Sequence, residues 1–136
     1  MPERMILIAD DEPYLVRSLS FVLRKEGYDV ESAADGEEAL RKFDEFNPEV
    51  VFLDLTMPKK DGFEVCHALR NDPKYRERMP YIIILTCKGQ DIDRYKGYLE
   101  GADEYITKPF SPVEVAGRLR EHFLGTAGLP SEKKNE

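Results

Sequence analysis

Five side chains capable of chemistry share one kind of position in this sequence, at or shortly after the end of a short apolar run. They are three acids, a hydroxyl and an ammonium group: Asp10, Asp11, Asp54, Thr86 and Lys108. The runs themselves are residues 5–9, 50–53, 81–85 and 104–106. If these runs are parallel strands, their carboxyl ends meet at one edge of the sheet and the five groups gather in one crevice. Such a crevice suits a metal ion and a phosphoryl group.

The acids set the chemistry of this crevice. Two carboxylates ~4 Å apart repel by ~4 kcal/mol at an effective dielectric constant near 20, and a hard cation relieves that repulsion. With few protein carboxylates and room for water and phosphate oxygens, Mg²⁺ fits better than a caged Ca²⁺. A second interpretation is that Asp10, Asp11 and Glu12 only cap the following helix. Helix capping accounts well for one acid at this position but poorly for two adjacent acids.

Asp54 and Lys108 have complementary chemistry. A carboxylate can attack a phosphoryl group and form an acyl phosphate, and a compact ammonium group can neutralise the transferring oxygens. The alternative for Lys108 is a solvated surface lysine, although a cis bond to Pro109 would fix its direction. Thr86 is capable of donating to a phosphoryl oxygen, yet a β-branched residue is also good strand chemistry. Taken without the other residues, Tyr105 in the last apolar run is interpreted as a core residue.

The elements that position these groups alternate along the chain. Apolar residues at helical spacing predict helices at residues 13–26, 36–46, 62–71, 91–100 and 112–124, with Ser111 capping the last. Besides the four runs above, residues 29–32 predict a short strand. Central strands that are apolar along their whole length indicate a parallel sheet with helices on both faces. Right-handed crossover connections then make a doubly wound sheet the expected topology.

Composition narrows the class of protein. The chain has 136 residues, 41% hydrophobic and 35% charged, which predicts one soluble domain over residues 1–124. A net charge of −7 argues against a nucleic-acid surface. Two cysteines, no span-length apolar run and no signal-peptide pattern indicate the cytoplasm. Residues 125–136 have the composition of a flexible tail or the start of a linker.

The combined motifs resemble the receiver domain of two-component response regulators. The residues that carry the resemblance are Asp10-Asp11, residues 54–62 (DLTMPKKDG), Leu85-Thr86 and residues 105–110 (YITKPF). The similarity covers about residues 4–124, nearly the whole chain. It implies the α/β flavodoxin-like (βα)5 fold, a doubly wound sandwich with five parallel strands in the order 2-1-3-4-5.

The resemblance also implies roles. A sensor histidine kinase or a phosphotransfer protein would phosphorylate Asp54, and the chain would be no enzyme beyond assisting its own phosphorylation and dephosphorylation. Asp11, Asp54 and the backbone carbonyl of Thr56 would bind Mg²⁺ or Mn²⁺, with Asp10 acting partly through water. The groups that would hold the phosphoryl oxygens are Lys108 and Thr86.

Family mechanism implies that Thr86 moves toward the phosphate and that Tyr105 rotates inward. This would reshape the face formed by the fourth helix, the fifth strand and the fifth helix. Charges on that face are similar to those of OmpR/PhoB-type receivers, where they join two protomers: Lys96 with Glu114, Glu100 with Arg120, and Glu104 with Arg118. A two-fold interface needs such self-complementary pairs, so phosphorylation would favour a homodimer. The alternative is a solvated charged face.

Other functions stay open at this point. A phosphatase of the haloacid dehalogenase type would need a second Asp two residues after Asp54, where Thr56 stands. A flavin or nucleotide binder would want a Gly/Ser/Thr-rich loop after the first strand, where acids stand instead. The chain is either a stand-alone switch or the receiver of a longer transcriptional regulator, and it has no helix-turn-helix of its own.

Cys87 departs from the commonest receiver pattern, which has Ala, Gly or Ser after the threonine. Its thiol is expected to narrow access to Asp54. A buried, inert thiol is the expectation here, and a reactive cysteine is the alternative.

Overall fold

A computed structural model describes residues 4–87 and 101–126 of the chain. Its centre is a five-stranded parallel sheet in the order β2-β1-β3-β4-β5, as the resemblance implied. The strands are β1 Met5–Ala9, β2 Asp29–Ala33, β3 Val50–Asp54, β4 Tyr81–Cys87 and β5 Glu104–Lys108. The predicted fold class is therefore confirmed.

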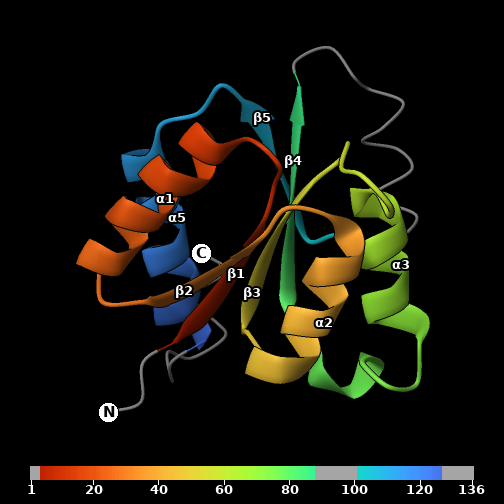
Figure 1. Ribbon diagram of the computed structural model, residues 1–136. Helices are drawn as coiled ribbons and strands as arrows, with labels where there is room; N and C mark the ends of the chain where they lie inside the picture. Colours follow the sequence, from red (N-terminus) through yellow and green to blue (C-terminus); the bar gives the residue numbers. More distant parts are fainter. Residues whose placement is uncertain (1–3, 88–100, 127–136) are drawn as a thin grey trace.

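Helices cover both faces of this sheet. They are α1 Pro13–Lys25, α2 Gly36–Phe46, α3 Gly62–Asn71 and α5 Pro112–Thr126, with a 3-10 turn η1 at Arg76–Arg78. Figure 1 shows α1 and α5 on one side of the sheet and α2 and α3 on the other. The helix predicted at residues 91–100 lies outside the described residues. In the ranges that the structure describes, no helix has both the length and the apolar character needed to cross a membrane.

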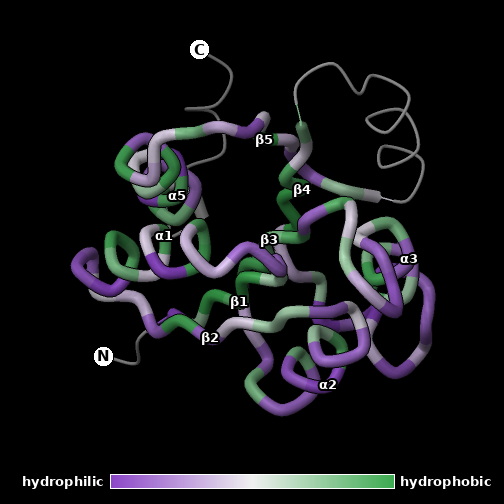
Figure 2. Tube along the Cα trace, turned by 45° about the horizontal axis from the view of Figure 1, so that its top comes forward, coloured by the Kyte–Doolittle hydropathy of each residue, from purple (hydrophilic) through white to green (hydrophobic). Residues whose placement is uncertain are grey.

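The core has two layers, one on each face of the sheet. Alternate strand residues such as Ile6, Ile8 and Phe52 pack toward α1 and α5, whereas Leu7 and Leu53 pack toward α2 and α3. Because both faces are covered, the central strands are apolar along their whole length. Figure 2 shows them as the hydrophobic interior of the molecule, with hydrophilic segments mostly around them.

The strands that carry the chemical groups run farther than the sequence predicted. β3 includes Asp54, and β4 and β5 stay paired through Thr86 and Lys108. Backbone pairing continues after the apolar pattern stops, since a polar residue at a strand end still fits the hydrogen-bond ladder. Asp54, Thr86 and Lys108 therefore project from the last positions of ordered strands, whereas Asp10 and Asp11 directly follow β1.

Helix caps fix the loops next to this edge of the sheet. The Asp35 carboxylate accepts from the backbone N–H of Glu38, 2.8 Å away, at the start of α2. Asp61 and Glu64 form a reciprocal capping box at the start of α3. The predicted cap of α5 is also present, because the Ser111 hydroxyl accepts from the Glu114 N–H at 3.3 Å.

The open edge of β2 is covered by two cationic side chains. A guanidinium nitrogen of Arg24, in α1, donates to the Val30 carbonyl at 3.0 Å. The Lys42 ammonium, in α2, donates to the Ser32 carbonyl at 2.7 Å. These contacts occupy backbone acceptors that would otherwise invite another strand to pair with this edge.

Candidate functional site

The three predicted acids come together at the carboxyl edge of the sheet. One carboxylate oxygen from each of Asp10, Asp11 and Asp54 lies within 4.8 Å of the others. Asp10 follows β1 directly, and its backbone N–H donates to the Ala33 carbonyl at 2.9 Å. Asp10 and Asp54 are buried, whereas Asp11 is exposed. The cluster therefore has two fixed inner acids and one outer acid that faces solvent.

Lys108 lies among these acids. Its Nζ is 3.0 Å from Asp10 Oδ2, 3.3 Å from Asp54 Oδ1 and 3.5 Å from Glu12 Oε1. Its side chain is only 12% exposed. The Lys108–Pro109 peptide bond is cis. Lys108 is therefore part of the site, and the alternative of a solvated surface lysine is wrong.

One oxygen of Asp10 still lacks a hydrogen bond. Asp10 Oδ1 accepts from the Glu12 N–H at 2.8 Å. Asp10 Oδ2 is buried, and among the described residues no group hydrogen-bonds to it. The Lys108 ammonium beside it balances its charge without hydrogen-bond geometry. A buried carboxylate oxygen in this state, next to two further carboxylates, fits a ligand set for a hard cation.

Burial and like charge shift the protonation of the acids. Desolvation and then the negative charge of Asp10 raise the pKa of Asp54 from 3.8 to about 6, despite opposing contributions from Lys108 and the Thr56 backbone N–H. Desolvation likewise raises the pKa of Asp10. Burial alone would lower the pKa of Lys108, but its contact with Asp10 and the surrounding negative charges raise it. The ammonium group therefore stays charged while the acids are strained as anions.

The two predicted switch residues lie on the same face of the sheet. Thr86 is buried, and its hydroxyl donates to the Cys87 carbonyl at 3.4 Å. Tyr105 is opposite Ile84 in the register and packs, half-buried, against the core layer beneath α2 and α3. Thr86, two residues after Ile84, points to this same side. Movement of the Thr86 side chain would therefore change the packing on the face of the sheet where Tyr105 lies.

The expectation of a buried Cys87 thiol is wrong. Cys87 is exposed, and only Cys66 is buried. The pairing of β3 with β4 ends with Asp54 opposite Leu85, so β4 projects past its neighbour on that side. Cys87 stands opposite Lys108 of β5, and both line a cavity of about 480 Å³. Cys87 therefore lies next to Lys108, in a cavity that Glu12 also lines but that none of the three clustered acids lines.

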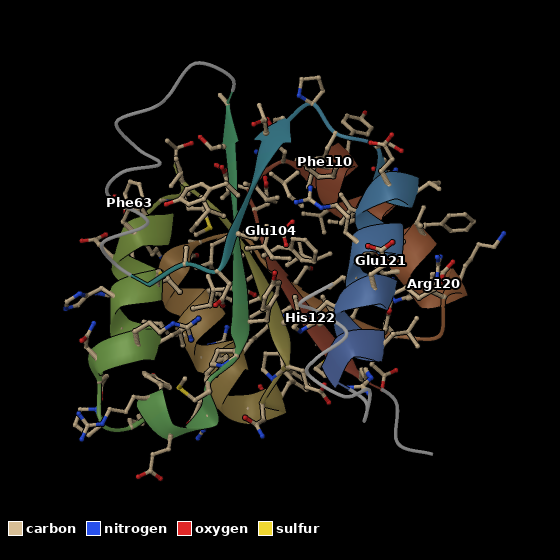
Figure 3. The ribbon with its side chains drawn as sticks, turned by 180° about the vertical axis from the view of Figure 1, so that it is seen from behind. Phe63, Glu104, Phe110, Arg120, Glu121 and His122 are labelled. Atoms are coloured by element: carbon tan, nitrogen blue, oxygen red, sulfur yellow. The ribbon has the colours of Figure 1, made fainter. Side chains whose placement is uncertain are left out.

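The charges predicted for a dimer face are partly paired within one chain. Arg118 forms an ion pair with Glu104, which also accepts from the Tyr81 hydroxyl at 2.9 Å. Arg120 lies 3.1 Å from Glu26, the residue that follows α1. Figure 3 labels Glu104 at the start of β5 and Arg120 on α5. Glu114 is exposed, and the predicted partners Lys96 and Glu100 lie outside the described residues.

Sequence reasoning missed one participant of the site. Glu12 precedes α1, but its side chain makes no cap hydrogen bond and instead reaches Lys108. No acidic residue stands in the first turn of α1. Asp10 and Glu12 therefore contact the Lys108 ammonium and Asp11 belongs to the carboxylate cluster, so helix capping does not explain the three acids. The signal available in the sequence was the run of three acids itself.

Comparison with known proteins decides the family. Residues 6–120 match the response regulator receiver domain. The chain belongs to that family. Receiver domains are regulatory domains rather than enzymes in the ordinary sense, and the acidic cluster of Asp10, Asp11 and Asp54 is typical of the Mg²⁺ site of receivers. The alternative interpretation as a phosphatase is therefore excluded.

Relatives of this receiver include both longer and similarly sized chains. It is 42% identical over 135 residues to the alkaline phosphatase synthesis transcriptional regulatory protein PhoP of Bacillus subtilis (strain 168), covering 98% of this chain and 55% of PhoP. The receiver thus spans about half the length of that relative. It also resembles the crystal structure of a putative response regulator from Chloroflexus aurantiacus (TM-score 0.79, 33% identity, 88% of this chain and 97% of that one).

Two further solved structures have similar size. The chemotaxis protein CheY4 of Vibrio cholerae is 32% identical with a TM-score of 0.79, and the match covers 88% of this chain and 98% of that one. The BeF3-activated receiver domain of DrrB is 29% identical with a TM-score of 0.76 over 88% and 97% of the two chains.

Proposed function

We propose that Asp54 accepts a phosphoryl group from the phosphohistidine of a sensor histidine kinase or a phosphotransfer protein. An Asp54 oxygen attacks phosphorus, the new P–O bond forms, and the P–N bond to the imidazole breaks. The imidazole nitrogen keeps that electron pair, and the ring, which carries a proton on its other nitrogen, leaves as neutral imidazole. With its pKa raised to about 6, Asp54 is still mostly ionised at pH 7, as a nucleophile must be. The single observation that carries this proposal is Lys108 held 3.3 Å from a buried Asp54 carboxylate.

The residues present fit a resident cation. The carboxylates of Asp10, Asp11 and Asp54 and the carbonyl of Thr56 would hold Mg²⁺, with Mn²⁺ as the other acceptable ion. When bound, the cation would neutralise charge on the acids and on the phosphoryl oxygens. The strongest support for this assignment is the cluster of carboxylate oxygens from Asp10, Asp11 and Asp54, which lie within 4.8 Å of one another.

Lys108 and Thr86 complete the phosphoryl site in this proposal. The Lys108 ammonium, already among the acids, holds one phosphoryl oxygen by charge. The Thr86 hydroxyl turns from the Cys87 carbonyl to donate to another oxygen. Tyr105 then rotates inward on the same face of the sheet. The result is a changed surface over β5 and α5, which carries the signal.

The changed surface is proposed to join two protomers. Its charged residues are Lys96, Glu100, Glu104, Glu114, Arg118 and Arg120. The in-chain pair of Glu104 with Arg118 and the contact of Arg120 with Glu26 would have to be shared or exchanged on dimerisation. Light scattering with and without Mg²⁺ and beryllofluoride tests this step: a doubled mass supports it, and an unchanged mass contradicts it.

We also propose that residues 1–124 are the receiver of a longer transcriptional regulator and that residues 125–136 begin the linker. Coverage of only 55% of PhoP, whose name describes a transcriptional regulator, supports this interpretation. The cytoplasm, where such regulators act, is the proposed location. A stand-alone switch is the second candidate, supported by the match that covers 98% of the chemotaxis protein CheY4.

The phosphoacceptor role is tested with acetyl phosphate, which removes the need for a kinase. Wild-type protein with Mg²⁺ should gain one phosphoryl group by intact mass, and Asp54→Asn should gain none. Glu45→Gln is the matched control, because Glu45 is an exposed acid on α2 away from the site. Labelling of the Asp54→Asn variant to wild-type stoichiometry would place the nucleophile elsewhere.

A further inference from the structure

The segment between β3 and α3 is folded into a tight turn. The Pro58 carbonyl accepts from the Lys60 N–H at 2.8 Å and from the Gly36 N–H at 3.3 Å. Lys59 between them has a positive φ of 71°. The turn therefore closes on itself and is at the same time hydrogen-bonded to the first residue of α2.

Gly36 allows this turn to lie directly on the start of α2. A Cβ atom at position 36 would be 2.1 Å from the Lys60 carbonyl oxygen and 2.4 Å from the Lys60 Cβ. Real Cβ atoms do not approach neighbours closer than 3.0 Å, and the nearest atom here is backbone. The Asp35 carboxylate, which caps α2, also lies 3.9 Å from the Lys59 ammonium. Any larger residue at position 36 must push the turn away from α2.

A second glycine holds the other end of the same segment. The Gly62 N–H donates to the Leu55 carbonyl at 3.1 Å, and a Cβ at position 62 would be 2.4 Å from the Asp54 carbonyl oxygen. Between these anchors, the side chains of Leu55 and Met57 are buried in the core, while Thr56 is exposed. The backbone around Thr56 is therefore fixed from both sides, and Gly36 supplies the contact that is remote in sequence.

We infer that Gly36 is a positioning residue for the cation site, because it seats the 58–60 turn and thereby places the backbone of Thr56 beside Asp54. This inference rests on the proposed function, in which the Thr56 carbonyl is a cation ligand. Gly36 itself touches neither the acids nor the cation. Its effect is transmitted through the turn and through Met57, whose buried side chain couples the turn to the core.

Calorimetric titration with MgCl2 tests the inference on the whole chain. Gly36→Ala should weaken Mg²⁺ binding by about tenfold or more, as the loss of a supporting contact around a metal site does. Lys60→Gly removes the Cβ that faces Gly36 and loosens the turn, so it should weaken binding by about two- to fivefold. Gly117→Ala in α5 is the matched control, because a Cβ there meets no atom within 4 Å. Its Mg²⁺ affinity should equal that of the wild type.

A merely structural role would give a different result. If Gly36→Ala lowers the melting temperature without Mg²⁺ but leaves the Mg²⁺ affinity unchanged, the inference is wrong. In the positioning role, saturating Mg²⁺ restores the rate of acetyl phosphate labelling to within about twofold of wild type, since the effect lies in affinity. A rate that stays low at saturation would also overturn the inference.

The outcomes separate this inference from the function on which it rests. A wild-type chain that binds no Mg²⁺ contradicts the proposed function itself. A wild type that binds Mg²⁺, together with Gly36→Ala and Lys60→Gly variants of equal affinity, contradicts the positioning role alone. If Gly36→Ala does not fold, Lys60→Gly decides the question, because Lys60 is a half-buried residue whose side chain the fold can lose.

Discussion

Replacing Asp54 with Asn should stabilise the fold when no Mg²⁺ is present. The raised pKa of Asp54 means that the folded chain holds this proton more tightly than the unfolded chain does. The stability that the protonated group contributes is therefore complete below pH 3.8 and is lost as the pH rises through about 6. A shift of two pKa units corresponds to about 3 kcal/mol. Because Asp54→Asn also gives up the attraction between the carboxylate and Lys108, we expect a gain of about 1–3 kcal/mol at pH 8.

Urea unfolding in EDTA, followed by circular dichroism at pH 4.5 and pH 8, measures this effect. The Asp54→Asn variant should be more stable than the wild type at pH 8, and the difference should shrink at pH 4.5, where wild-type Asp54 is protonated. Glu45→Gln should stay within about 0.5 kcal/mol of wild type at both pH values. An Asp54→Asn variant that is no more stable at pH 8, or whose gain does not depend on pH, would refute the electrostatic reasoning.

Three further predictions follow from the same geometry. Lys108→Met should lower the free energy of unfolding by about 3 kcal/mol at pH 8. The loss should be clearly smaller at pH 4.5, since the carboxylates that face Lys108 lose their charge there. An equal loss at both pH values in urea unfolding would contradict this prediction. Labelling by acetyl phosphate at saturating Mg²⁺ should fall only below pH 6, because a bound cation would bring the pKa of Asp54 down from its raised value of about 6; a midpoint above pH 7 would contradict this. A thiol reagent should modify Cys87 rapidly and Cys66 only after unfolding, and rapid modification of both would contradict the burial seen here.

The sequence predicted the elements well where strong breakers bound them. α2 and α3 begin and end as expected, because Asn47-Pro48 and Asp72-Pro73 stop the helical pattern. β1 ends where the sequence predicted, but the ends of β2, β3, β4 and β5 were placed one or two residues early. An apolar pattern stops at the last apolar residue, whereas β3 and β4 continue through the buried polar residues Asp54 and Thr86, and β5 continues through Thr107 and Lys108. Apolar periodicity reports where apolar side chains are buried, and it cannot report backbone pairing by polar residues.

The sequence also predicted which acids and which lysine form the site, but not the exposure of the residues beside it. Asp10, Asp11, Asp54 and Lys108 meet as expected, because parallel strands bring their carboxyl ends to one edge. The exposure of Cys87 depends on how far β4 projects past β3, which is a matter of register. Local composition does not encode register between strands that are distant in the chain.

Contacts between distant segments were beyond sequence reasoning. The approach of Gly36 to Lys60 joins two loops, and only the assembled sheet brings them together. The pair of Glu104 with Arg118 has complementary charge whether it forms within one chain or between two, so the sequence could not distinguish the two cases.

The central claim is that Asp54 is the phosphoacceptor. Acyl phosphates are reduced by borohydride to the corresponding alcohol, so treatment of the acetyl phosphate-labelled chain followed by peptide mass mapping locates the modified residue. We predict one modified peptide, with homoserine at position 54 and unmodified aspartates at positions 10 and 11. Modification at Asp10, at Asp11 or at no aspartate would contradict the account.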